Sequence, residues 1–106
     1  MVYTIDEIKE KISPIAKKWG IPLVYLFGSY ARGEADDESD IDLAFDYNNS
    51  NVVGLDYFTL LRELKSEYKT NIDLLSIDQI SEKHMFGNHI EREFEKDKII
   101  IFEKES

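Results

Sequence analysis

Residues 26–45, LFGSYARGEADDESDIDLAF, limit the possible folds of this chain more than any other stretch. The stretch begins inside an apolar run, Leu23–Phe27, that stops at Gly28-Ser29, and an acidic loop then leads to Asp40-Ile41-Asp42. This order predicts a buried strand, a tight turn, a loop and a second strand. Side chains at positions i and i+2 of a strand point the same way, roughly 6.5–7 Å apart along the backbone. Asp40 and Asp42 can therefore converge on one divalent cation or on a pair of them.

The spacing of apolar residues predicts the remaining elements. A 3–4 residue period indicates helices over residues 4–19, 54–69 and 79–95, with a short helix from Tyr30 to Gly33. Pro14 should kink or split the first helix, and Gly87 is a weak point in the last. Apolar or alternating runs indicate strands over residues 23–27, 40–46, 71–77 and 98–102. We expect an α/β fold in which a short mixed β-sheet is flanked by α-helices.

Composition excludes several classes of protein. The 106 residues are enough for one domain, which we expect to span 1–106. The net charge of -9 argues against stable binding of duplex nucleic acid, and the absence of cysteine excludes thiolate metal sites. Neither a signal peptide nor an apolar run long enough to span a membrane is present, so no membrane association and a cytoplasmic location are expected.

A third carboxylate, Asp73, interrupts the apolar strand predicted over residues 71–77. Burying such a group is costly without a partner or a metal ion. With Asp40 and Asp42 it would form the three-carboxylate cluster that two-metal phosphoryl or nucleotidyl transfer requires. The Gly28-Ser29 turn would offer backbone N–H groups and a hydroxyl to phosphates.

These motifs together resemble a known signature. Gly28-Ser29, ten residues and then Asp40-Ile41-Asp42 are similar to the signature of the polymerase-β-like nucleotidyltransferase superfamily. The strings FGSYARGEA and ESDIDL resemble its minimal nucleotidyltransferase (MNT) branch, as do NIDLL around Asp73 and the closing HIEREFEKDKIIIFE. The resemblance covers nearly the whole chain and implies a nucleotidyltransferase fold and enzyme.

The resemblance also implies roles for individual residues. Gly28 and Ser29 would hold the triphosphate of ATP. Asp40, Asp42 and Asp73 would be the catalytic residues and would ligate Mg²⁺, two ions being expected, and Asp73 would help to deprotonate the acceptor hydroxyl. Arg32 would either contact phosphate or form an ion pair with the acidic loop.

The MNT branch further implies a partner. Its members commonly pair with HEPN-domain RNase toxins, and studied antitoxins of this branch transfer AMP from ATP to a tyrosine of the toxin. Two alternatives stay open, namely an antitoxin that acts by binding alone and a transferase that modifies a small molecule. A homo- or hetero-oligomer is compatible with either.

The remaining candidates have plainer interpretations. Asp46 is expected to be a solvated strand end, and the two histidines, five residues apart, are expected at the surface rather than in a metal site. Trp19, Phe58 and Phe86 fit core or interface positions.

Overall fold

The fold is built on a four-stranded mixed β-sheet. A computed structural model describes residues 2–81 and 87–105 of the chain. The strands are β1 (Leu23–Phe27), β2 (Ile41–Phe45), β3 (Ile72–Ser76) and β4 (Ile99–Glu103), in the spatial order β3-β2-β1-β4. Strand β1 runs antiparallel to β2 and β4, whereas β2 and β3 are parallel. The predicted mixed sheet is confirmed, and β3 is one of its two edge strands.

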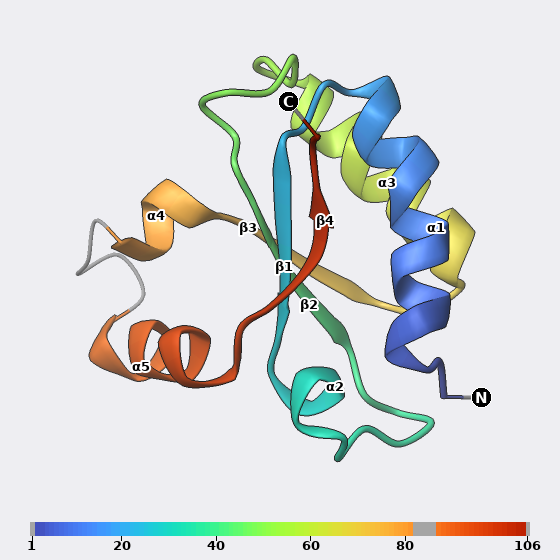
Figure 1. The fold of residues 1–106 in the computed structure, drawn as a ribbon, viewed down its shortest axis with the longest axis vertical. Helices are drawn as coiled ribbons and strands as arrows, with labels where there is room; N and C mark the ends of the chain where they lie inside the picture. Colours follow the sequence, from blue (N-terminus) through green and yellow to red (C-terminus); the bar gives the residue numbers. More distant parts are fainter. Residues whose placement is uncertain (1, 82–86, 106) are drawn as a thin grey trace.

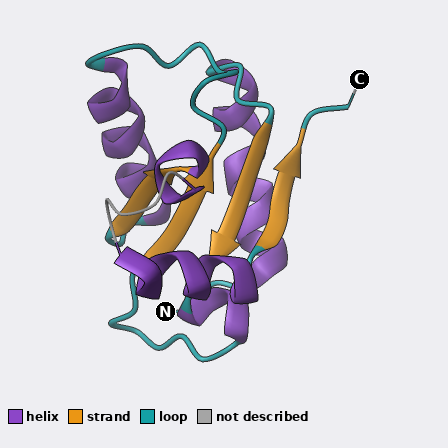
Figure 2. Ribbon diagram, turned by 90° about the vertical axis from the view of Figure 1, so that its left-hand side faces the viewer, coloured by secondary structure: helices purple, strands orange, loops and turns teal. Residues whose placement is uncertain are grey.

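Helices cover both faces of this sheet. Helices α1 (Ile5–Lys18) and α3 (Asp56–Tyr68) lie on one face, and α4 (Ile77–Ser81) and α5 (Gly87–Asp97) lie on the other (Figures 1 and 2). The short helix α2 (Ser29–Arg32) follows β1 directly. Within the described ranges, no helix has the length and apolar character needed to cross a bilayer.

The first helix begins as its sequence predicts. The Thr4 hydroxyl accepts a hydrogen bond from the Glu7 N–H, and the Glu7 side chain accepts one from the Thr4 N–H, which completes a capping box. Pro14 lies inside α1, so the predicted split did not occur. Buried Ile12 and Ile15 on either side of Pro14 hold the helix against the sheet, and this packing outweighs the cost of the missing N–H.

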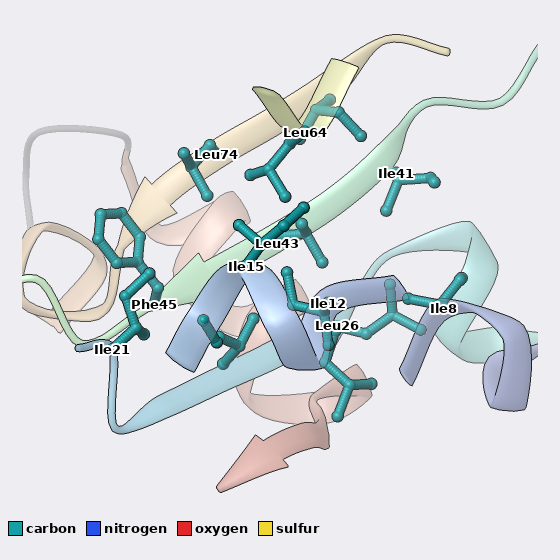
Figure 3. Close-up of a cluster of buried hydrophobic side chains, with 14 of the residues drawn as sticks. Ile8, Ile12, Ile15, Ile21, Leu26, Ile41, Leu43, Phe45, Leu64 and Leu74 are labelled. Carbon is teal, nitrogen blue, oxygen red and sulfur yellow. The ribbon is translucent and has the colours of Figure 1, made fainter. Parts of the chain in front are cut away.

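Two apolar clusters pack against the two faces of the sheet. The larger one joins α1 and α3 to the sheet through residues that include Ile8, Ile12, Leu26, Leu43 and Leu64 (Figure 3). The smaller one contains Phe27, Ala44, Ile80 and Phe94 beneath α4 and α5. Strands β1 and β2 are therefore enclosed from both sides, as expected for strands at the centre of a layered α/β fold.

Two predictions about the helices need correction. The structure describes two helices, α4 and α5, where one helix was expected over residues 79–95, and the stretch between them lies outside the described residues. Helix α3 buries Leu60, Leu64 and Tyr68, whereas Phe58 is 58% exposed, which excludes a core position and leaves the interface position as a prediction. Trp19, by contrast, packs against the main cluster, and its indole N–H donates to Glu63.

Candidate functional site

Two carboxylates lie side by side at the centre of the candidate site. Asp42 on β2 is paired in register with Asp73 on the parallel strand β3, so the two side chains share one face of the sheet. On the other face, Ile41 and Leu43 are buried, because alternation along β2 separates its apolar and acidic positions. The predicted strand positions of Asp42 and Asp73 are therefore confirmed.

Burial and neighbouring negative charges raise the pKa of Asp42. Burial, a hydrogen bond with Asp73 and the charges of Asp73, Glu93 and Asp40 raise the pKa of Asp42 to about 7. Near neutral pH this carboxyl is thus poised between its protonated and ionised forms. A cation placed between Asp42 and Asp73 would relieve the repulsion.

Gly28 provides the space in which Asp42 sits. Its backbone has φ 75° and ψ -154°, a region that is accessible almost only to glycine. A Cβ atom at this position would lie 2.1 Å from Oδ2 of Asp42. Glycine at position 28, at the end of β1, is therefore required both by the turn and by the close approach of the Asp42 carboxylate.

An open pocket surrounds these groups. Its volume is about 680 Å³, within the range of small-molecule sites. Besides Asp42 and Asp73, its walls include Ser29 at the start of α2, Asp40, Tyr57 of α3 and Glu93 of α5. The pocket therefore joins the predicted turn, the predicted carboxylates and two side chains from distant helices.

Asp40 is placed differently from the prediction. It is exposed and precedes β2, which begins at Ile41, so it lies outside the strand in which the alternating pattern had put it. Its charge still acts on Asp42. Among the described residues, no group of three or more carboxylates or histidines is arranged to hold a metal ion.

The donor set nevertheless fits a hard divalent cation in its chemistry. Asp42 and Asp73 offer oxygen ligands, which Mg²⁺ prefers, and Asp73, Glu93 and Asp40 add negative charge around the partly buried Asp42. Of the three carboxylates expected to form a cluster, Asp42 and Asp73 form a close pair, and Asp40 lines the same pocket.

Arg32 pairs with two acidic residues outside the carboxylate pair. Its Nε donates to Glu34 over 2.9 Å and its Nη1 donates to Asp97, whose side chain is only 4% exposed, over 2.5 Å. These two acidic partners raise the pKa of Arg32 further above its ordinary value. The ion pair with the acidic loop is therefore present, whereas the contact with phosphate stays a prediction.

Variants of Arg32 and Asp97 test whether Arg32 serves as a structural ion pair or as a phosphate contact. Because Arg32 joins α2 to the end of α5, we expect Arg32→Ala and Asp97→Ala each to lower the thermal unfolding midpoint, with the nucleotide KM unchanged. Thermal denaturation and initial-rate kinetics on both variants provide the measurement. A KM that rises in Arg32→Ala but not in Asp97→Ala would instead assign Arg32 to the phosphates.

Sequence reasoning missed Glu93 and Tyr57. Glu93 reaches the pocket because the neighbouring Phe94 packs edge-on against Phe27, 5.5 Å between ring centroids, and anchors α5 there. Tyr57 donates its hydroxyl hydrogen to the backbone carbonyl of Leu74 over 2.6 Å. Neither position carries a local motif, so only the packing of α3 and α5 could reveal them.

Other predicted residues lie apart from the pocket or outside the described part. Asp46 accepts two hydrogen bonds from Asn49 and closes the turn after β2, so it serves a local structural purpose. Predictions for His84, Phe86 and the side chain of His89 fall outside the described residues.

Comparison with known proteins gives a consistent result for sequence and for fold. Residues 10–106 match the family model described as polymerase beta, nucleotidyltransferase. A protein of Methanocaldococcus jannaschii, provisionally named a protein adenylyltransferase, is 35% identical over 103 residues, which cover 92% of this chain and 98% of the relative. A second protein of that organism with the same provisional name is 38% identical over 76 residues, 72% of this chain and 81% of its own length.

Solved structures share the fold at lower identity. A chain from a crystal structure of a toxin–antitoxin pair with AMP-PNP superposes with a TM-score of 0.68 at 20% identity, covering 92% of this chain and 74% of that one. A chain from a complex of a tri-AMPylated Shewanella oneidensis HEPN toxin with an MNT antitoxin gives a TM-score of 0.60 at 18% identity, with 91% and 70% covered. At these identities the likeness concerns the fold.

Proposed function

This chain belongs to the polymerase beta nucleotidyltransferase family, and we propose that it transfers AMP from ATP to a protein in a Mg²⁺-dependent reaction. The observation that supports this most is the Asp42–Asp73 pair, held under Gly28 in an open pocket. The predicted enzyme class, a nucleotidyltransferase, agrees with the family and with the names of the relatives.

In this proposal each side chain has a distinct task. Asp42 and Asp73 would hold Mg²⁺, and Asp40, which lines the same pocket, would be a further ligand. Ser29 and the backbone of Gly28 hold the triphosphate at the pocket wall to which Ser29 contributes. Bound Mg²⁺ would neutralise the phosphate oxygens and the charge that develops on the leaving group.

The reaction is an in-line displacement at the α-phosphorus. A hydroxyl oxygen of the acceptor forms the new P–O bond while the bond to the β-phosphate oxygen breaks and pyrophosphate leaves. Asp73 accepts the proton of the attacking hydroxyl, a role that suits its exposed position on the edge strand. Positioning by Gly28, Ser29 and the carboxylates supplies much of the rate.

A protein acceptor is supported by the surface beside the pocket. Val53, Leu55 and Phe58, at and just before the start of α3, are 68%, 80% and 58% exposed. The Phe58 ring contacts the ring of Tyr57, which lines the pocket. Neighbouring exposed apolar side chains of this kind mark surfaces that contact other proteins. The solved complex of an AMPylated HEPN toxin with an MNT antitoxin supports a partner of this kind, with this chain as the antitoxin. The acceptor that we propose, a tyrosine of the toxin, follows from the resemblance to the MNT branch.

The test is the intact mass of the cognate HEPN-type partner after incubation with this protein, Mg²⁺ and each nucleoside triphosphate in turn. We expect one or more AMP increments with ATP and wild-type protein, and none with Asp42→Asn. Peptide mapping of the modified partner would identify the acceptor residue, which we expect to be a tyrosine.

Other outcomes would contradict the proposal in distinct ways. A partner that is inhibited by both proteins without gaining mass would favour an antitoxin that acts by binding alone. Transfer to a small hydroxylated molecule in the absence of any partner protein would favour a small-molecule transferase. Modification that persists in Asp42→Asn would remove Asp42 from the catalytic machinery.

A further inference from the structure

A second pocket of about 630 Å³ lies next to the carboxylate pocket. Its walls combine the rings of Phe45, Tyr47 and Tyr57 with the polar side chains of Asn48, Asp78 and Gln79. Flat aromatic walls with a few convergent polar groups are typical of sites that bind a planar heterocycle. None of the roles assigned above uses this pocket.

The two pockets are neighbours along the edge strand β3. Both are lined by Tyr57, Leu74 and Leu75, the first extends to Asp73 and the second to Ser76. Ser76 lies three residue steps along the strand from Asp73, a span of about 10 Å. A nucleotide with its α-phosphate at Asp73 can therefore extend its ribose and base along β3 into the second pocket.

The second pocket also contains an unsatisfied acceptor. Oδ2 of Asp78 is buried and has no hydrogen-bond partner among the parts of the chain that the structure describes. Its neighbour Gln79 is used structurally, since its Oε1 accepts from the N–H of Ser76. Buried polar atoms are nearly always paired, so an orphaned acceptor in a pocket wall indicates a donor that arrives with a ligand.

We propose that the second pocket binds the nucleobase and that Oδ2 of Asp78 accepts a hydrogen bond from the exocyclic amino group of adenine. This rests on the proposed nucleotidyl transfer and adds to it the residue that selects the base. Guanine has a carbonyl oxygen at the equivalent ring position. This oxygen and the Asp78 carboxylate are both hydrogen-bond acceptors, so no hydrogen bond would form between them. Asp78 thereby favours ATP over GTP.

Nucleotide binding measured without turnover tests this assignment. Isothermal titration of the whole protein with non-hydrolysable ATP and GTP analogues and Mg²⁺ should show a preference for the adenine nucleotide of about tenfold. Asp78→Ala should lose most of that preference, chiefly by weaker binding of the ATP analogue. The matched control is Asp6→Ala on the exposed side of α1, which should leave both affinities unchanged.

A second measurement on wild-type protein does not depend on the folding of a variant. In amide NMR spectra, adenosine alone should shift the resonances of Tyr47, Asn48 and Gln79, whereas tripolyphosphate with Mg²⁺ should shift those of Gly28 and Ser29. Guanosine at the same concentration should leave the second pocket unchanged. Adenosine shifts that are confined to the carboxylate pocket would overturn the proposal.

The failure of this inference can be told from the failure of the proposed function. If nucleotide binds and Asp78→Ala keeps the full preference for adenine, Asp78 does not read the base while nucleotidyl transfer stands. If wild-type protein binds no nucleoside triphosphate with Mg²⁺, both the proposed function and the base pocket are overturned.

Discussion

At pH 8 and without divalent cations, the free energy of unfolding of Asp42→Asn should exceed that of wild type by about 1–2 kcal/mol. With Mg²⁺ and ATP present, the same variant should transfer AMP about a thousandfold more slowly than wild type, or slower still. The two effects have one origin. At this pH Asp42 is ionised in a half-buried position next to Asp73, Glu93 and Asp40, and burial together with this repulsion raises its pKa from 3.8 to about 7. An isosteric amide removes the charge and with it both the repulsion and the carboxylate that we propose as a metal ligand.

The pH dependence of this stability difference has a defined sign. In the folded protein Asp42 holds its proton up to about pH 7, whereas in the unfolded chain it releases it near 3.8. Its contribution to the free energy of unfolding is therefore complete below about pH 4 and is lost as the pH rises to about 7. A shift of this size has a ceiling of about 4 kcal/mol, and solvent screening of the half-buried group reduces it to the smaller value above.

Urea denaturation of both proteins at pH 4.5 and pH 8, with chelator and with Mg²⁺, measures these effects. The advantage of Asp42→Asn should be small at the lower pH and largest at pH 8, and Mg²⁺ should stabilise wild type but not the variant. Glu10→Gln, which removes an exposed charge on α1, controls for the net charge of -9. If Glu10→Gln stabilises as much as Asp42→Asn, the site carries no special electrostatic strain.

Gly28→Ala is expected to reduce transfer by about a hundredfold or more and to destabilise the fold by about 1–3 kcal/mol. The new Cβ would need the space of Oδ2 of Asp42, 2.1 Å away, and an alanine would be strained at φ 75°. Because the carboxylate must move, both metal binding and the alignment of the phosphates should suffer. Transfer kinetics and chemical denaturation on the same preparation measure the two losses.

Gly33→Ala is the matched control for this variant. Gly33 has a similar φ, 76°, but its ψ of 23° places it in the left-handed helical region, and a Cβ there would meet nothing within 4 Å. We expect Gly33→Ala to show the smaller backbone cost of that region, about 1 kcal/mol, with normal transfer. Equal losses of activity in the two variants would show that the contact between position 28 and Asp42 has no special effect.

The sequence by itself determined the local elements and the central carboxylate pair. Asp42 and Asp73 are each flanked in the sequence by apolar residues of a strand. Because side chains alternate along a strand, each carboxylate must point to the face of the sheet away from its buried apolar neighbours. Thr4 with Glu7 defines the start of α1, and Gly28 defines the turn. Such features depend on neighbours close in the chain, which a sequence displays directly.

Long-range packing decided the rest of the candidate site. Glu93 acts on Asp42, and Tyr57 contacts Leu74 on the edge strand β3, although these residues are far apart in the chain. The exposure of Asp40 likewise depends on how the folded chain surrounds it. The exposure of Phe58 follows from which side of α3 faces the sheet, a choice that periodicity leaves ambiguous when apolar residues occur on several sides of a helix.

The burial of Asp78 Oδ2 shows the same limit most clearly. In the sequence Asp78 is a plausible helix cap, and nothing near it distinguishes a cap from a ligand-binding acceptor. Only the tertiary structure places it inside α4, on the wall of a pocket shared with Phe45, Tyr47 and Tyr57. Hydrogen-bond satisfaction depends on every group that surrounds an atom, and those groups come together only when the chain has folded.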